Sequence, residues 1–251
     1  MPPYAYIIMI ESELIFVSGE DLYNEGKNAV YTLDYETAVE KFKQAADLGN
    51  DHAMYELGYL YHEGKGVSKN SLRAIRYFKR SARVGNADGL CALGNCYLYG
   101  DGIAKDLDKA FDCFRKAAIT GHFYAIYELG FCYDFGFGTE EDNEKAVECY
   151  KIAAENGVVA AMYELGSCYY HGEGVDVDYK TAVDWWDKAA RLGNPLAIYE
   201  LGNRYLFGEG VEKDLEMAVR LFKMSAEAGN SYASEKLEKI LNMMLEQMSK
   251  R

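Results

Sequence analysis

The sequence predicts an all-α fold, a solenoid of helix-turn-helix repeats, from three observations. A Leu-Gly pair recurs every 36 residues, at Leu57-Gly58, Leu93-Gly94, Leu129-Gly130, Leu165-Gly166 and Leu201-Gly202. A Gly-x-Gly motif follows each of these pairs, and an alanine with an aromatic residue four positions later recurs six times at the same interval. A fixed period between about 20 and 50 residues indicates a repeat architecture, in which each unit buries its apolar face against its neighbours.

The first half of each unit is predicted to be an amphipathic helix. In the stretch AMYELGYLYHEGKG, Leu57, Gly58 and Tyr61 share one helical stripe at about 100° per residue. A glycine inside a helix costs about 1 kcal/mol relative to alanine, so its repetition indicates that a neighbouring helix approaches closely. Gly64 and Gly66 then end the helix, because glycine adopts the left-handed conformation of a C-cap. A phosphate-binding loop is excluded, since no strand pattern precedes the glycines and no Gly-Lys-Ser/Thr follows.

The second half of each unit is predicted to be another helix. It starts after a residue suited to an N-cap, namely Asn70, Asp106, Asp142, Asp178 or Asp214. Its alanine and aromatic residue lie one turn apart on one face. The glycine at its end is followed by an asparagine in several units (Asn50, Asn86, Asn194 and Asn230), which is suited to cap the next first helix.

These motifs resemble the Sel-one-like repeat family, a relative of the tetratricopeptide repeats. The matching pattern is A-x-x-x-L-G-x-x-Y-x-x-G-x-G, then a capping Asp or Asn, A-x-x-x-F and Gly-Asn, and it covers about residues 18–240. The resemblance implies a right-handed α–α superhelix. It also implies an adaptor that holds other proteins and has no catalytic activity.

The chain is expected to be one array with distinct ends. Residues 1–17 form an N-terminal segment expected to be amphipathic and to pack on the first repeat. Residues 18–50 form an atypical repeat that resembles a tetratricopeptide repeat, and residues 51–230 form five 36-residue repeats. Residues 231–251 form a C-terminal capping helix, which gives seven first helices and six second helices in all. Terminal repeats need a different outer face to stay in solution.

Composition narrows the function classes. The 27 basic and 40 acidic residues give a net charge of −13, which argues against nucleic-acid binding through a basic face. Glu11 and Glu13 interrupt the apolar start of the chain, so neither a membrane span nor an export signal is expected there. The six cysteines form no CxxC pair, which favours reduced thiols and a cytoplasmic protein; a secreted effector remains an alternative.

The partner-binding site is predicted on the first helices, which line the concave surface in similar folds. Side chains that face away from the core stripe form a band of aromatic and small polar residues. The predicted members are Tyr55, Tyr59, Asn95, Tyr99, Tyr127, Phe131, Phe135, Tyr163, Tyr170, Tyr199, Asn203 and Phe207. Such residues suit the capture of a peptide or helix. A second set, Glu56, Glu128, Glu164 and Glu200, edges the band and favours a basic or amphipathic segment as the partner.

Two other interpretations of this band stay open. The tyrosines also fit a purely structural role, packed between adjacent first helices. The glutamates also fit a role in which they only keep the surface soluble, since glutamate is a good helix former.

Catalytic, metal and cofactor sites are not expected. His52, His62, His122 and His171 show no ligand spacing, and the polar candidates for catalysis occupy repeated structural positions. Buried thiols behave as small apolar groups, which is the role predicted for Cys96, Cys132 and Cys168.

Alternatives to these expectations involve the cysteines and the groove. Disulfides Cys96–Cys113 and Cys132–Cys149 would join the two helices of a unit. The alternative to a scaffold is a secreted effector, or a small-molecule-binding or hydrolase-like activity in the groove. The cysteine-rich relatives suggest this alternative.

Overall fold

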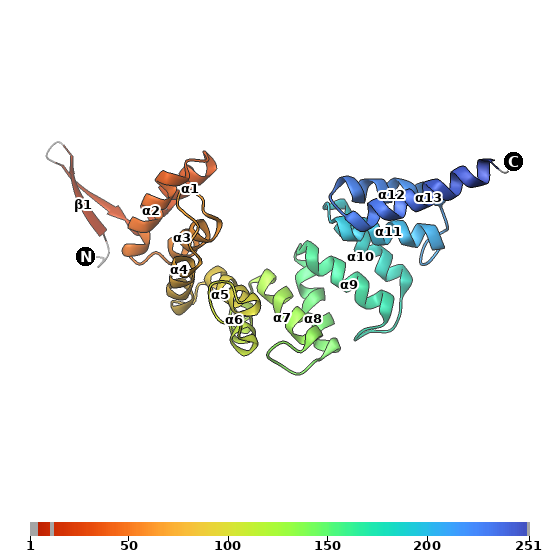
Figure 1. Cartoon of the computed structure of the whole chain (residues 1–251). Coiled ribbons are helices and arrows are strands. Elements are labelled where there is room, and N and C mark those ends of the chain that lie inside the picture. Colours follow the sequence, from red (N-terminus) through yellow and green to blue (C-terminus); the bar gives the residue numbers. More distant parts are fainter. Residues whose placement is uncertain (1–4, 11–12, 250–251) are drawn as a thin grey trace. The chain divides into compact units, whose positions relative to one another are not determined.

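The computed structural model describes residues 5–10 and 13–249, which form two compact units. The first unit holds residues 1–125 and 137–139, and the second holds 126–136 and 140–251. Figure 1 shows the helices following one another in pairs along the chain. The helices of the first unit are α1 (Gly19–Tyr31), α2 (Tyr35–Asp47), α3 (Asp51–Glu63), α4 (Ser71–Arg83), α5 (Ala87–Tyr99) and α6 (Leu107–Ile119). Helix α7 (Phe123–Phe135) begins in the first unit and continues in the second, which also holds α8 (Asn143–Glu155), α9 (Val159–His171), α10 (Tyr179–Arg191), α11 (Pro195–Phe207), α12 (Leu215–Glu227) and α13 (Ser231–Ser249).

The predicted repeat architecture is confirmed in the described part of the chain. Odd-numbered helices α1 to α13 are the seven first helices, and even-numbered helices α2 to α12 are the six second helices. Helices α1 to α12 each span 13 residues, whereas the terminal α13 spans 19. No helix among the described residues is long and apolar enough to cross a membrane.

The N-terminal segment differs from the expectation of purely helical structure. Strands β1 (Ala5–Ile10) and β2 (Glu13–Ser18) pair antiparallel, with Ala5 opposite Ser18 and Ile10 opposite Glu13. Both stretches are rich in β-branched and aromatic residues, which favour strands. Strand β2 contacts α1, and Val17 packs against the hydrophobic core of the first unit. Residues 1–4 and 11–12 lie outside the described residues.

Capping residues set the ends of the repeated helices. Asp178 accepts hydrogen bonds from two backbone amides at the start of α10, and Asn194 accepts one at the start of α11. Gly172 ends α9 in the left-handed conformation, with φ of 77°. These contacts satisfy amide groups that have no partner within the helix. The start of α9 is an exception, because Val158 stands at its N-cap and makes no side-chain cap.

The repeated glycine of the first helix allows the close approach that its recurrence predicted. A Cβ atom on Gly58 would lie 2.6 Å from the ring of Phe78, on the second helix of the same repeat. A Cβ atom on Gly166 would lie 2.6 Å from the indole of Trp186 in the same way. The aromatic residue of each second helix therefore lies directly over the backbone of its first helix. Phe78 and Trp186 are correspondingly buried.

Each unit has a hydrophobic core built from the same repeat positions. In the first unit, Leu57 and Phe42 are fully buried with the recurrent alanines. In the second unit, Leu165, Tyr150 and Trp186 take the equivalent places. Every repeat therefore buries the same face of its first helix.

Candidate partner-binding site

The predicted tyrosines nearest the core are structural. Tyr55 packs against Phe78 with ring centroids 6.1 Å apart, and Tyr199 packs against Phe222 at 5.5 Å. Tyr127 lies 5.9 Å from the ring of Tyr150. These tyrosines are half-buried, and each ring contacts an aromatic ring of the second helix of its own repeat.

Two further predicted residues of the second unit lie within polar clusters. Tyr170 is half-buried and stacks with the guanidinium of Arg204, whose Cζ lies 3.9 Å from the ring centroid. The Tyr170 hydroxyl donates a hydrogen bond of 3.2 Å to Glu209. Asn203 is only 7% exposed and donates to Glu200 at 3.4 Å, so its side chain offers little surface to a partner.

Exposed aromatic residues lie at the ends of the first helices. Tyr99, Phe135 and Phe207 occupy the same repeat position, the last residue of α5, α7 and α11, and are 71%, 54% and 58% exposed. Phe131 lies one turn before Phe135 and is half-buried, with ring centroids 4.6 Å apart. The half-buried Tyr163 uses its backbone carbonyl to accept a hydrogen bond from Trp186 Nε1 at 3.1 Å. The predicted band thus divides into inner residues that pack and outer residues that are accessible.

One cavity in the first unit gathers four of the predicted residues. It has a volume of about 720 Å³ and lies against α3 and α5. Tyr55, Tyr59, Asn95 and Tyr99 all line it. This volume falls in the range of small-ligand pockets in proteins, about 300–1,000 Å³.

Two departures from the repeat explain why space opens here. At the position of Tyr55, Tyr127, Tyr163 and Tyr199, the second repeat carries Cys91. At the position of Glu56, Glu128, Glu164 and Glu200, it carries Ala92. Cys91 and Ala92 both line the cavity, so smaller side chains leave the volume that the other repeats fill.

The lining is acidic. Glu63, Asp88 and Asp101 contribute carboxyl groups, and none of the described residues that line the cavity is a lysine or arginine. His62 Nδ1 lies 3.3 Å from Asp101, and its Nε2 lies 3.5 Å from Glu63. The field in the cavity therefore favours a cation.

Tyr55 of the cavity keeps its proton at neutral pH. Burial raises the pKa of Tyr55 to about 12, and the carboxyl groups of Asp88 and Glu56 act in the same direction. On the rim, the ammonium of Lys65 lies 5.2 Å from the ring centroid of Tyr59, which is 39% exposed. The Tyr59 ring is thus placed where it can accept a cation on its face.

None of the four glutamates that edge the band is exposed. Glu56, Glu164 and Glu200 are half-buried, and Glu128 is 5% exposed. Burial raises the pKa of Glu56 and raises that of Glu164 to about 7. Their burial does not fit the alternative in which these residues only keep the surface soluble.

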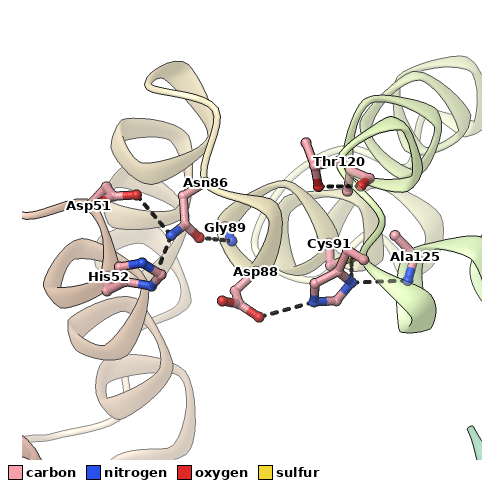
Figure 2. A network of polar contacts seen from close by, with 10 residues as sticks. Asp51, His52, Asn86, Asp88, Gly89, Cys91, Thr120 and Ala125 are labelled. Carbon is pink, nitrogen blue, oxygen red and sulfur yellow. Dashed lines mark hydrogen bonds and ion pairs between the residues drawn. The ribbon is translucent and has the colours of Figure 1, made fainter. Parts of the chain in front are cut away.

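A polar network beside the cavity was not predicted from the sequence (Figure 2). His122 Nδ1 accepts a hydrogen bond of 3.1 Å from the backbone N–H of Ala125 and lies 3.5 Å from Cys91 Sγ. His122 Nε2 lies 3.1 Å from Asp88 Oδ1. The hydrogen bond to His122 is the main cause that lowers the pKa of Asp88. The sequence does contain an indication of this network, because His122 stands where most other repeats carry asparagine.

A matched asparagine cap lies one repeat earlier in the same network. Asn86 accepts from the backbone N–H of Gly89 at 2.9 Å, and its Nδ2 lies 3.0 Å from Asp51 Oδ2 and 3.2 Å from His52 Nδ1. Figure 2 shows these contacts on one side of Asp88 and those of Cys91 and Ala125 on the other. The cap positions therefore connect consecutive first helices of the first unit.

Comparison with known proteins identifies the repeat. The family model of the Sel1 repeat matches residues 16–50, 51–86, 87–122, 123–158, 159–194 and 195–230. The chain belongs to the Sel1 repeat family. The resemblance drawn from the motifs is confirmed, and the matched stretches include residues 16–50, the first and most divergent repeat. Sel1 repeat proteins are generally scaffolds for protein–protein interaction.

Solved structures of Sel1 repeat proteins are similar to this chain. A Sel1 repeat protein from Oxalobacter formigenes is 32% identical, with a TM-score of 0.81 over 87% of this chain and 89% of that one. A protective antigen of uropathogenic Escherichia coli strains is 31% identical, with a TM-score of 0.73 over 91% of this chain. This chain spans about half, 52%, of the length of that antigen. No curated protein matches the chain.

A more distant structure shares the fold alone. The immunity protein PA5088 from Pseudomonas aeruginosa is 20% identical, with a TM-score of 0.54 over 90% of this chain and 87% of that one.

The cysteines of these Sel1 repeats do not form the two disulfides considered above. All six are thiols, and Cys96, Cys132 and Cys168 are buried, as the prediction of small core residues requires. The described residues contain no group of three or more His, Cys, Asp and Glu side chains arranged to hold a metal ion.

Proposed function

We propose that this Sel1 repeat protein is a non-enzymatic scaffold whose first unit holds a basic side chain of a partner segment. The observation that carries the proposal is the composition of the cavity against α3 and α5: tyrosine rings, three carboxyl groups and no lysine or arginine among its described lining. A lysine or arginine side chain has the charge and the reach to enter such a cavity. The unbridged cysteines are compatible with a reducing compartment, which supports a cytoplasmic location.

Each part of the lining would contribute separately. The exposed ring of Tyr99 provides a face for a cation, a contact worth about 0.5–2 kcal/mol. Asp101 and Glu63 provide negative charge, and each has a carboxyl oxygen within 3.5 Å of a ring nitrogen of His62. Asn95 provides a polar side chain in the lining.

In the second unit, we assign partner contact to the outer aromatic residues. Phe207 is more than half exposed and lies at the same repeat position as Tyr99. Tyr199 serves mainly to hold the two helices of its repeat together, because its half-buried ring packs against Phe222 of its own second helix. A partner helix with spaced apolar residues would use such outer rings as contact points.

Binding of a defined peptide tests the proposal. A fluorescently labelled helical peptide with leucine on one face and lysine on the other is titrated with the full chain, and anisotropy is followed. The same peptide with glutamate in place of lysine is the charge control. We expect binding of the lysine peptide, and weaker binding as salt is raised. Equal affinity for both peptides would contradict a cation-selective cavity.

Tyr99→Ala and Tyr232→Ala form a matched pair of variants. The two side chains are 71% and 69% exposed, but only Tyr99 lines the cavity. We expect about a 10-fold loss of affinity for Tyr99→Ala, which corresponds to about 1.4 kcal/mol and lies within the range of one cation–π contact. An equal effect of Tyr232→Ala would assign the binding to general surface contacts.

Cys91→Tyr provides an independent test by filling the cavity. Four other repeats carry tyrosine at this position, so the substitution restores a residue that the fold accommodates elsewhere. We expect loss of peptide binding with unchanged helical circular dichroism. Retained binding would place the partner outside this cavity.

A further inference from the structure

We propose that Cys91 is a reactive thiol, activated by His122, that undergoes selective thiol–disulfide exchange with small cationic disulfides entering the α3–α5 cavity. The site consists of Cys91 on α5, His122 directly before α7, and Asp88 one turn before Cys91. All three side chains line the cavity of about 720 Å³.

The geometry supplies a base for the thiol. The Ala125 N–H donates to His122 Nδ1, so this nitrogen carries a lone pair and the ring proton lies on Nε2. Cys91 Sγ lies 3.5 Å from that same Nδ1, and the Nε2 proton points to Asp88 Oδ1 at 3.1 Å. A nucleophile beside a base that a third group orients is the arrangement that activates thiols.

The small disulfide is the oxidant in this exchange. His122 Nδ1 takes the proton of the Cys91 thiol, and the thiolate attacks one sulfur of the small disulfide. The disulfide bond of the reagent breaks as the new bond to Cys91 Sγ forms. The leaving thiolate takes up the proton from the imidazolium. A small thiol reverses the exchange, so the adduct is reducible.

Asp88 offsets the cost of the charged intermediate state. When Nδ1 accepts the proton of the thiol, the Ala125 N–H loses its acceptor. The carboxylate at Nε2 stabilises the imidazolium that forms. We therefore assign Asp88 as a positioning residue and Cys91 as the group that reacts.

The other five cysteines lie in different surroundings. Burial raises the pKa of Cys96, Cys113 and Cys149 to about 11, and that of Cys132 and Cys168 to about 12. A buried thiol of this kind is unreactive at neutral pH. Cys91 differs in that its sulfur lies 3.5 Å from an imidazole nitrogen, His122 Nδ1.

The charge of the cavity selects the reagent. Glu63, Asp88 and Asp101 line the cavity without a lysine or arginine among its described lining. Cystamine carries two ammonium groups, whereas oxidised glutathione is anionic. Cys91 itself is 5% exposed, so only a small reagent fits against its sulfur.

The test measures which cysteine of the folded full chain reacts first. The protein is treated with cystamine, 2-hydroxyethyl disulfide or oxidised glutathione at neutral pH, and the modified peptide is identified by mass spectrometry. We expect a first adduct on Cys91, formed fastest with cystamine and slowest with oxidised glutathione. A first adduct on another cysteine, or equal rates at all six, would overturn the proposal.

His122→Asn separates the base from the helix cap. Asparagine caps α3, α5 and α11 at this repeat position, so the variant keeps a cap for α7 while it loses the imidazole. We expect the modification rate of Cys91 to fall by at least about 10-fold, at an unchanged unfolding midpoint. An unchanged rate in a folded variant would refute the role of His122.

Asp88→Asn tests the positioning role through the pH profile. The amide oxygen still accepts the Nε2 proton, but the negative charge is gone. The charged and titratable groups that face Asp88 and Cys91 from α3 are His52, Tyr55 and Glu56, and all three remain. We expect the midpoint of the rate-against-pH curve to move to lower pH, because losing the negative charge favours loss of a proton from the imidazolium and from the thiol. An unchanged midpoint would show that Asp88 does not act on the thiol through His122.

The exchange reaction does not depend on partner binding, because its readout is a covalent mass change on the isolated chain. Failure of peptide binding would leave the modification of Cys91 unaffected. Conversely, an unreactive Cys91 would leave the peptide titration with Tyr99→Ala intact as a test of the scaffold function.

Discussion

Replacing Glu164 with glutamine should stabilise the protein above neutral pH and have a much smaller effect in mild acid. Glu164 lies on α9, and burial is the main cause that raises its pKa from 4.5 to about 7; Asp134 and Glu173 act in the same direction. The folded state therefore keeps this proton over a range of pH in which the unfolded chain has lost it. Between pH 4.5 and 7 the folded state binds more protons, so its stability falls as pH rises and then stays low.

The magnitude follows from the interval between the two pKa values. At about 1.4 kcal/mol per pH unit, the interval from 4.5 to about 7 gives a ceiling of about 3 kcal/mol at pH 8. At pH 5 the same linkage amounts to less than about 1 kcal/mol. Glutamine keeps the size of the side chain and removes the charge, so the variant should recover up to these amounts.

Urea unfolding followed by circular dichroism at pH 5 and pH 8 measures the effect. Glu148→Gln is the matched control, because Glu148 is an exposed glutamate on α8 in the same unit. We expect Glu164→Gln to raise the free energy of unfolding at pH 8 well above its gain at pH 5. An equal gain at both pH values, or the same gain in Glu148→Gln, would refute the assignment of a buried, protonated Glu164.

Three further substitutions test the repeat packing by urea unfolding. Gly166→Ala would place a carbon atom 2.6 Å from the indole of Trp186, and we expect a loss of about 1–3 kcal/mol from overpacking; a neutral effect would contradict the close approach. Tyr199→Ala removes a ring packed against Phe222, and we expect a loss of about 2–4 kcal/mol; a loss below 1 kcal/mol would make Tyr199 a surface residue. Val158→Asn supplies the side-chain cap that α9 lacks, and we expect a gain of about 0.5–1 kcal/mol; a loss would show that the packing of Val158 outweighs the cap.

The helical architecture was predictable because the same local motif recurs many times in the sequence. One glycine inside a helix is weak evidence, but Gly58 and its equivalents recur at the same step and so require a common physical cause. That cause is the aromatic ring of the second helix, as Phe78 over Gly58 shows. The caps were predictable for the same reason, since Asp178 and Asn194 recur at fixed distances from each helix.

The N-terminal hairpin was not predicted because it occurs once. The stretch AYIIMI has strand-forming residues, but it lacks the alternation of polar and apolar positions that marks a half-buried strand. Propensity alone is a weak guide when an apolar run is short. Pairing with a second strand, ELIFVS, is a tertiary fact that neither stretch contains by itself.

A helical wheel also could not predict how deeply each site residue is buried. Tyr199 and Phe207 lie on the same face of α11, yet Tyr199 packs against Phe222 while Phe207 is 58% exposed. A wheel gives the direction of a side chain from its own helix, whereas burial depends on which second helix covers it. Asn203 shows the same limit, because its neighbour Glu200 and the surrounding helices bury it.

Positions that depart from the repeat pattern are candidates for functional residues. A residue that is kept in every repeat serves the packing common to all repeats. A residue that departs from the pattern does not serve this common packing. Cys91 and Ala92 replace larger residues, and His122 replaces a capping asparagine, all within the repeat of residues 87–122. In the folded first unit these three residues meet at one cavity with Asp88. Val158 also departs from the capping asparagine, so one departure alone is weak evidence; the convergence of three departures on one acidic cavity supports the site proposed there.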